Sequence, residues 1–509
     1  MARRALALGA AAAILGTTPC AAQSDPVLDA IWREGMENSR VEPLAQTLLD
    51  SIGPRLAGSP GEAAARAWVL ARYREWGVDA RDEKYGTWTG WRRGATRVDL
   101  VSPRARSLNA AMLAWSPGTE APVRAPVVVL PRAASPAEFS AWLATVAGKF
   151  VLVSPPEPTC RPDDGWARWA EPATLERMRG ARAEAAAAWE ARVAATGVAE
   201  RWLPIRLEGA GVAGVIASHW SGGWGASQIH NTWTLRVPML ELSCEDYGLA
   251  FRLAENGQAP EFRVSAEAEF LGDVPVSNTV AEIRGAIPSE YVILSAHLDS
   301  WDGAAGATDN GAGTVAVMEA MRILRRAYPR PRRTLLAGHW GGEEQGLNGS
   351  LSFATDHPEV VRGIRALFNQ DQGTGRVAAV SAGGAPRAAE RLRRWLASVP
   401  GADSVVVATP DSAERDGSDH VSFACRGAPA YNLLSRGWDY RPYTWHTDRD
   451  SFDKLVIDEV RANAVLLAML AYLASEDGEP LTVAAPPAGA PACRVPARSM
   501  VEFLERLMR

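Results

Sequence analysis

Five short motifs hold the residues of this chain that could do chemistry. In chain order they are HLDSW (297–301), TDNGAG (308–313), GEEQG (342–346), NQD (369–371) and WHTDRD (445–450). Each follows a predicted strand or opens a loop, and together they are rich in histidine and carboxylate. A dinuclear zinc hydrolase needs two histidine nitrogens, two terminal carboxylates and one carboxylate that bridges the metals. The five motifs contain that set.

The ligand types divide into two groups that share one residue. We assign His297 and Asp371 to one zinc ion, Glu344 and His446 to a second, and Asp309 to both. Three carboxylates offset much of the charge of two Zn²⁺ ions, so a site of this kind need not be strongly charged overall. The sequence therefore predicts two zinc ions per chain.

Three further acidic residues have supporting roles in this hypothesis. Glu343 precedes the ligand Glu344 but points elsewhere, because neighbouring side chains on an extended or turning backbone diverge. We expect Glu343 to be the general base that moves a proton from water to the leaving amine. Asp299 can accept a hydrogen bond from the ring nitrogen of His297 that does not bind metal, and Asp450 can do the same for the second ligand histidine.

The composition excludes other classes of function. The 509 residues include 54 basic and 59 acidic side chains, for a net charge of −5. With this balance the protein has no strong positive electrostatic potential to bind a polyanion, so we expect no nucleic-acid partner. Of the seven histidines, three lie in motifs if the SDH motif at 418–420 is counted. We interpret the other four as ordinary surface or loop residues: His219, His230, His339 and His357.

Residues 1–22 are typical of a signal peptide. Arg3 and Arg4 precede an apolar run at 5–16, which ends in small residues before cleavage after Ala22. We therefore expect export to the periplasm or the outside of the cell. No later stretch reaches the roughly 20 apolar residues of a membrane span. Of the five cysteines, the four beyond the leader have no CxxC spacing, which allows one or two disulfides but disfavours a cysteine zinc site.

Strands and helices alternate from residue 278 onward. This alternation predicts an α/β fold, a three-layer sandwich with a mostly parallel central sheet. Ligands of such sheets bind beyond the carboxyl ends of the strands, which is where the motifs lie. The predicted strands are 291–297, 333–339, 364–370, 404–408 and 430–435, and the predicted helices are 313–327 and 454–475.

The catalytic domain is predicted to be divided in sequence. We expect residues 23–109, with a helical stretch at 41–82, and residues 270–509 to form it together. Between them, residues 110–269 change to short β-rich runs separated by Gly and Pro, with one exposed helix at 170–196. We interpret this middle segment as an inserted module.

The motifs in this order resemble the co-catalytic zinc exopeptidases, which include bacterial leucyl aminopeptidases, glutamate carboxypeptidases and glutaminyl cyclases. Within that group HLDSWD is most similar to the carboxypeptidase Q branch. The resemblance begins near residue 41 and implies two zinc ions at the five positions above, with Glu343 as the base. It also implies a cis peptide bond between Asp309 and Asn310, and a protease-associated domain in the insert.

One position departs from this resemblance. Some relatives place a tyrosine directly before the last ligand histidine, where its hydroxyl steadies the oxyanion. Here that residue is Trp445, which can donate only through its indole N–H. Tyr443 and His420 are the other candidates for this role.

These inferences predict an exported dizinc exopeptidase that hydrolyses dipeptides or short peptides. A broad aminopeptidase is the nearest alternative. A glutaminyl cyclase-like acyltransferase with one zinc, and a non-catalytic receptor-like protein, are hypotheses from other classes. The expected partner is a small peptide, and monomer and homodimer both stay open.

Overall fold

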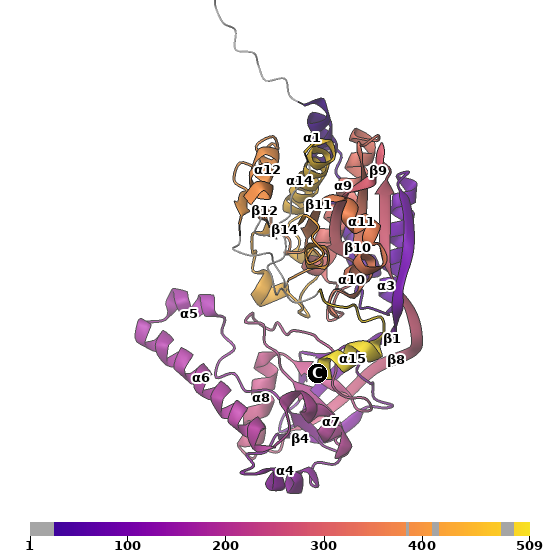
Figure 1. The fold of residues 1–509 in the computed structure, drawn as a ribbon. Coiled ribbons are helices and arrows are strands. Elements are labelled where there is room, and N and C mark those ends of the chain that lie inside the picture. Colours follow the sequence, from indigo (N-terminus) through magenta and orange to yellow (C-terminus); the bar gives the residue numbers. More distant parts are fainter. Residues whose placement is uncertain (1–24, 383–385, 410–416, 480–492, 509) are drawn as a thin grey trace, which may run out of the picture.

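The chain forms two lobes joined by a pair of long strands (Figure 1). The computed structural model describes residues 25–382, 386–409, 417–479 and 493–508. Strands β1 (Asp79–Ser102) and β8 (Glu261–Ile283) pair antiparallel and run from one lobe into the other. We call the lobe with α1–α3 and β9–α14 the first lobe, and the lobe with β2–α8 and α15 the second lobe.

A mostly parallel sheet forms the centre of the first lobe. Its strand order is β13-β12-β14-β11-β9-β10-β8. Strand β9 runs parallel to both β10 and β11, and β11 runs parallel to β14. Strand β8 is antiparallel to β10, and β12 is antiparallel to β14. The bounds are β9 (Ile287–His297), β10 (Arg333–Trp340), β11 (Ile364–Gln370), β12 (Val377–Ser381), β13 (Val406–Ala408) and β14 (Ala430–Ser435).

Helices cover both faces of this sheet. On one face Val315 of α9 and Leu467 of α14 belong to the same buried cluster as Val292 of β9. On the other face Phe353 of α10 packs on Trp340 of β10, with ring centroids 5.1 Å apart. The α/β class and the mostly parallel sheet are thereby confirmed. These helices are α1 (Pro26–Glu37), α2 (Val41–Gln46), α3 (Pro60–Glu75), α9 (Ala312–Ala327), α10 (Asn348–Asp356), α11 (Pro358–Gly363), α12 (Pro386–Leu396), α13 (Val421–Ala424) and α14 (Ile457–Glu476).

The second lobe is a smaller α/β unit rather than a purely β-rich one. Strands β4 to β7 form a parallel ladder, as the short apolar runs predict. Helices between these strands cover it, and α6 matches the helix predicted at 170–196. Assignment of this lobe to a protease-associated domain stays a prediction. The elements are β2 (Arg106–Leu108), β3 (Ala110–Met112), β4 (Val123–Val129), β5 (Phe150–Leu152), β6 (Gly214–Ala217), β7 (Met239–Leu242), α4 (Pro136–Leu143), α5 (Asp163–Trp169), α6 (Pro172–Ala195), α7 (Leu203–Gly209) and α8 (Cys244–Glu255).

The two long strands were not predicted. The pairing of β1 with β8 shifts register in four places, three of them beside Gly86, Gly90 and Arg93, so the apolar alternation that marks a strand is interrupted. Because both strands cross between the lobes, the boundaries at 110 and 269 stay a proposal.

The C-terminal segment returns to the second lobe. Helix α15 (Met500–Met508) places the ring of Phe503 5.6 Å from that of Trp88 on β1. Ahead of it, the Thr87 N–H donates to the Arg498 carbonyl oxygen over 2.8 Å. This return was not expected from the sequence, which placed residues 270–509 in one domain.

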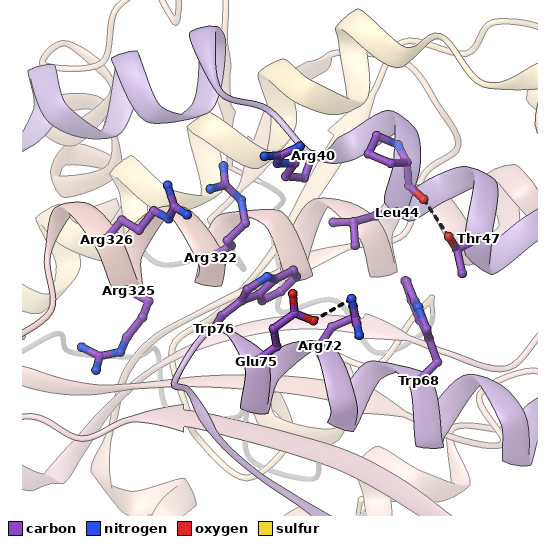
Figure 2. Close-up of a pocket in the computed structure, with 11 residues that line it drawn as sticks. Arg40, Leu44, Thr47, Trp68, Arg72, Glu75, Trp76, Arg322, Arg325 and Arg326 are labelled. Atoms are coloured by element: carbon purple, nitrogen blue, oxygen red, sulfur yellow. Dashed lines mark hydrogen bonds and ion pairs between the residues drawn. The ribbon is translucent and has the colours of Figure 1, made fainter.

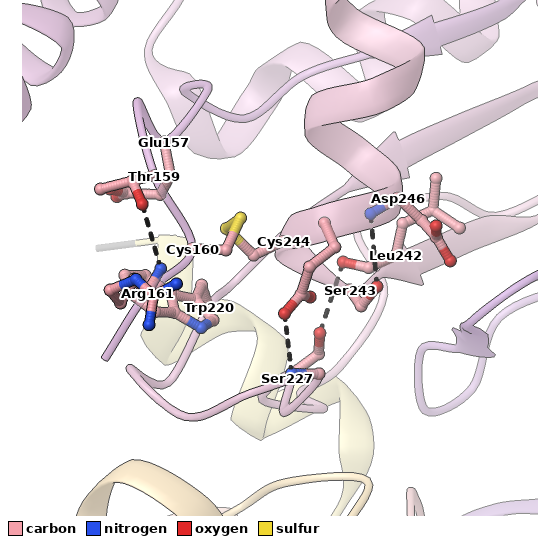
Figure 3. The surroundings of a disulfide bond; sticks show 12 residues. Glu157, Thr159, Cys160, Arg161, Trp220, Ser227, Leu242, Ser243, Cys244 and Asp246 are labelled. Atoms are coloured by element: carbon pink, nitrogen blue, oxygen red, sulfur yellow. Dashed lines mark hydrogen bonds between the residues drawn. A yellow bond between two sulfur atoms is a disulfide. The ribbon is translucent and has the colours of Figure 1, made fainter. Parts of the chain in front are cut away.

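Two disulfides confirm the expectation drawn from the cysteines. Cys160 pairs with Cys244 at the start of α8 (Figure 3), and Cys425 pairs with Cys493. Each helix in the described part of the chain is too short or too polar to cross a bilayer. The predicted signal peptide, residues 1–22, lies outside the described residues.

Candidate metal centre

The five predicted ligands converge at one edge of the first-lobe sheet. His297 ends β9, Asp371 follows β11, and Glu344 lies in the loop after β10. Asp309 lies in the helical turn η3 (Ala307–Gly311), and His446 lies in the loop after the turn η4 (Tyr440–Thr444). The carboxyl ends of neighbouring parallel strands therefore bring together residues that are far apart in sequence.

Asp309 stands between two groups of possible ligands. His297 Nε2 lies 3.3 Å from Asp309 Oδ1 and 3.3 Å from Asp371 Oδ1. His446 Nε2 lies 3.2 Å from Asp309 Oδ2 and 3.0 Å from Glu344 Oε2. Within each group of three, the ligand atoms lie within 4.8 Å of one another. Each carboxylate oxygen of Asp309 thus faces a different histidine, which is the geometry of a bridging ligand.

The donor set fits two zinc ions. Imidazole nitrogen and carboxylate oxygen are ligands that zinc takes in catalytic sites. Glu344 Oε1 is buried and accepts no hydrogen bond from the described residues, as expected for an oxygen that a cation would satisfy. Burial lowers the pKa of His446, but the carboxylates of Glu344 and Asp309 outweigh it and raise that pKa to about 10. The centre therefore attracts positive charge. The peptide bond between Asp309 and Asn310 is cis, as the resemblance implies.

Asp299 orients His297 through its backbone rather than through its carboxylate. His297 Nδ1 lies 3.0 Å from the Asp299 carbonyl oxygen and 3.6 Å from Oδ1. The carboxylate instead accepts from the backbone N–H of Glu343 and Glu344, over 3.2 and 3.3 Å. The sequence placed Asp299 correctly beside His297, but its side chain holds the neighbouring loop.

Asp450 also differs from its predicted role. Its carboxylate accepts from the backbone N–H of Thr308 over 2.8 Å and of Asp309 over 3.0 Å. Burial raises the pKa of Asp450 to about 7. Asp450 thus holds the turn that carries the bridging ligand, and does not orient His446 as expected.

Glu343 lies within electrostatic reach of the first ligand group. Burial, together with the carboxylates of Asp371 and Asp419, holds the pKa of Glu343 well above its ordinary value. Such a carboxyl group holds a proton more readily than an exposed one. Its position and its proton affinity suit the predicted general base.

The oxyanion candidates lie in different places. The Trp445 ring stacks on the His446 ring with centroids 4.0 Å apart. The Arg441 guanidinium also lies over the Trp445 ring, 4.1 Å from its centroid. Tyr443 lies against Gly223 of the second lobe. His420 is buried at the start of α13. An oxyanion role for any of the three stays a prediction.

Tyr440 is a site residue that the sequence analysis missed. Burial and the carboxylates of Asp309 and Asp371 raise its pKa well above the ordinary value, so its hydroxyl keeps its proton at neutral pH. Tyr440 also lines a cavity of about 300 Å³ with Thr308, the neighbour of Asp309. The YRPYTWH stretch (440–446) contained the signal, but it offers two tyrosines and sequence alone favoured the nearer one.

Arg55 was also missed. Its guanidinium is fully buried and donates to four backbone carbonyls, three of them between His297 and Asp309 and one in its own loop. The acceptors are the carbonyl oxygens of Leu298 at 2.6 Å, Gly53 at 3.1 Å, Ala305 at 2.6 Å and Gly306 at 2.9 Å.

Two of the histidines interpreted as ordinary belong to the neighbourhood of the site. The His230 ring lies 5.4 Å from the His446 ring, and the His219 ring lies 6.2 Å from that of His230. Burial, with His446 and His219 nearby, lowers the pKa of His230 to about 3. His339 is buried and bonds the Tyr73 hydroxyl over 2.7 Å, so it is a core residue. His357 is partly exposed beside Glu83, as expected of a surface residue.

A larger cavity lies elsewhere on the first lobe. It measures about 600 Å³ between α2, α3 and α9, and no metal ligand lines it (Figure 2). Its buried arginine, Arg322, is already paired with Glu34 and Glu319.

Comparisons with known proteins agree with this geometry. Residues 278–471 match the model of peptidase family M28. The chain is 26% identical to carboxypeptidase Q of Xenopus laevis over 460 residues, which are 89% of this chain and 90% of that one.

Solved structures show the same fold. A peptidase M28 precursor from Shewanella amazonensis superposes with a TM-score of 0.65 at 21% identity, covering 91% of this chain and 98% of that one. A zinc aminopeptidase from Bacillus subtilis gives 0.54 at 19% identity, covering 84% and 93%. Residues 278–471, which match the model of peptidase family M28, carry all five ligand positions, and the chain is a zinc metallopeptidase of the exopeptidase type.

Proposed function

We propose that this chain is an exported dizinc exopeptidase that hydrolyses dipeptides or short peptides. The observation that carries the proposal is the position of Asp309, whose two carboxylate oxygens each face one ligand histidine. His297 and Asp371 would complete one zinc position, and Glu344 and His446 the other. When bound, the two ions would lower the pKa of a water molecule and polarise the substrate carbonyl.

Glu343 moves the proton in this proposal. As a carboxylate it accepts a proton from the attacking water, and as an acid it donates that proton to the leaving amine. The carboxylate of Asp299 accepts a hydrogen bond from the backbone N–H of Glu343, and this bond holds the backbone that carries the base. The raised proton affinity of Glu343 supports the first half of this transfer, in which Glu343 takes the proton from water.

Tyr440 is the group that we assign to the oxyanion. Its hydroxyl keeps its proton, Tyr440 lines a cavity with Thr308, and an O–H donor in that cavity can stabilise negative charge on the substrate oxygen. The stacking of Trp445 on His446 leaves the indole a packing role. Of the predicted candidates, Tyr443 is three residues from this position.

The second lobe limits the room for substrate. The cavity beside Tyr440 is lined both by first-lobe residues and by Asp164 of α5 in the second lobe. Its volume of about 300 Å³ is at the small end for a ligand site, so it suits one or two amino-acid residues. This enclosure favours short peptides over folded proteins. The likeness to carboxypeptidase Q over most of both chains supports the same proposal.

Export is part of the proposal. The disulfides Cys160–Cys244 and Cys425–Cys493 are typical of proteins that fold outside the reducing cytosol. The sequence of residues 1–22 supplies the matching leader.

Blocked and unblocked peptides test the substrate class. A dipeptidase should cleave a free dipeptide and should fail on both its N-acetylated and its C-amidated forms. An aminopeptidase, the second candidate, should accept the C-amidated form. Cleavage of the N-acetylated dipeptide would contradict both. Cyclisation of an N-terminal glutamine by a protein with one zinc per chain would favour an acyltransferase instead.

A further inference from the structure

His446 and His297 are held in different ways. His297 Nδ1 lies 3.0 Å from the Asp299 carbonyl oxygen. His446 Nδ1 is buried and makes no hydrogen bond with the described residues. A metal-binding histidine usually donates its second ring nitrogen to a carboxylate, a carbonyl or water, and this bond fixes the ring. Among the described residues, packing contacts rather than such a bond hold the His446 ring.

The backbone of His446 also needs support. Its φ angle is +60°, in the left-handed region that few residues other than glycine adopt. Such a conformation persists where the surroundings hold it. The His446 carbonyl oxygen accepts a hydrogen bond from the Ile229 N–H over 2.7 Å. Ile229 belongs to the second lobe, so that lobe reaches the backbone of a metal ligand.

Three rings surround the imidazole of His446. Trp445 stacks on it, His230 meets it at 84° with centroids 5.4 Å apart, and the Trp301 ring lies 6.2 Å away. His230 also lies 5.3 Å from Trp301. The rings of His230, His446 and Trp301 thus form a triangle in which each ring lies near the other two. It is the second-lobe ring in direct contact with His446.

The two loops that carry these residues are joined along their length. Residues 219–231 of the second lobe face residues 442–449 of the first. Asp448 and Ser227 exchange two bonds of 3.0 Å, one through the Asp448 carboxylate and one between backbones. Arg449 donates to the Gly225 carbonyl oxygen over 2.8 Å, and Ser221 Oγ donates to the Pro442 carbonyl oxygen over 2.7 Å. The His446 loop is therefore clamped from the second lobe.

We propose that the second lobe completes one of the two metal positions. Loop 219–231 fixes the backbone and ring of His446. His230 is the positioning residue, because its ring packs against the imidazole and keeps it facing Asp309 and Glu344. The other position, with His297 and Asp371, is carried by the first-lobe sheet. This inference rests on the two-metal assignment proposed above, and it gives the second lobe a role in metal binding that is separate from any contact with substrate.

Zinc binding by three variants tests this role. His230→Ala removes the ring that packs on His446, His230→Phe keeps a ring without imidazole nitrogens, and His357→Ala is the control at a surface histidine. Bound zinc is measured at buffered free zinc, and anomalous X-ray scattering locates the ion that remains. We expect His230→Ala to lose about 10- to 100-fold in affinity at the Asp309, Glu344 and His446 position, the usual cost of losing a partner that orients a ligand. His230→Phe and His357→Ala should bind two ions.

The results distinguish three roles for His230 at the metal position: packing by its ring, a contribution of its imidazole nitrogens, or no role. Equal zinc affinities in His230→Ala and the parent would overturn the proposal. If His230→Phe loses as much zinc affinity as His230→Ala, the packing role of His230 is wrong, because a ring alone would then not be enough to position His446. If His230→Ala does not fold, Arg449→Ala loosens the same clamp from the surface and should weaken the same position. A parent that binds one zinc would overturn the two-metal assignment itself, whatever the variants do.

Discussion

Arg55 is the residue whose removal should show most clearly how the metal loops are held. Its buried guanidinium donates to four backbone carbonyls at 2.6 to 3.1 Å. Arg55→Met fills similar space but leaves three of those acceptors without a partner among the described residues, because the Gly306 carbonyl oxygen also accepts from the Gly311 N–H over 2.9 Å. At the lower limit of about 1 kcal/mol for each buried acceptor left unsatisfied, the loss is about 3 kcal/mol. Burial lowers the pKa of Arg55 to about 10, so the charge is still present at neutral pH.

Calorimetric melting of the metal-free protein measures this loss. At about 2 °C per kcal/mol for a chain of this size, Arg55→Met should lower the melting temperature by about 6 °C. Arg55→Lys should recover part of it, because an ammonium keeps the charge but lacks the planar fork. The matched control is Arg325→Met, which removes one bond of 2.9 Å to the Gly77 carbonyl oxygen and should cost less than about 2 °C. A melting temperature for Arg55→Met within 2 °C of the parent, or a fall as large in the control, would refute the reasoning.

Three other predictions concern the reaction centre. Glu343→Gln should reduce kcat by at least about 10²-fold while two zinc ions stay bound, because it removes the base and no ligand; full activity would exclude this role. Tyr440→Phe should lower kcat by about 10²- to 10³-fold with little change in zinc content, whereas Tyr443→Phe should have little effect; the reverse order would move the oxyanion role to Tyr443. Zinc binding near neutral pH should release protons, because the pKa of His446 is about 10 in the metal-free centre and zinc takes the neutral imidazole. Calorimetry in buffers of different ionisation enthalpy measures that release, and zinc affinity should fall as the pH falls.

The sequence predicted those site residues that belong to short, recognisable motifs. His297 and Glu344 follow strands whose apolar runs are unmistakable, and the order of strands implies a shared edge. The sequence could not predict Arg55, because its acceptor Leu298 is 243 positions away and the bond arises only when the loops pack. His230 was dismissed for the same reason. Its ring reaches His446 only because the second lobe folds onto the first.

Side-chain roles were harder to predict than positions. Asp299 and Asp450 lie beside the ligands as expected, but both carboxylates bind backbone N–H groups instead of ligand imidazoles. Proximity in sequence does not distinguish between these partners. The long strands β1 and β8 were hidden by bulges and by polar residues on both faces, since each strand is only partly covered between the lobes.

Anomalous X-ray diffraction at the zinc edge, from crystals of the zinc-loaded protein, tests the central claim most directly. The account predicts two peaks about 3.5 to 4 Å apart, one bound by His297 and Asp371, one by Glu344 and His446, and both by Asp309. A single peak at full zinc loading, or a second peak away from Asp309, would contradict it.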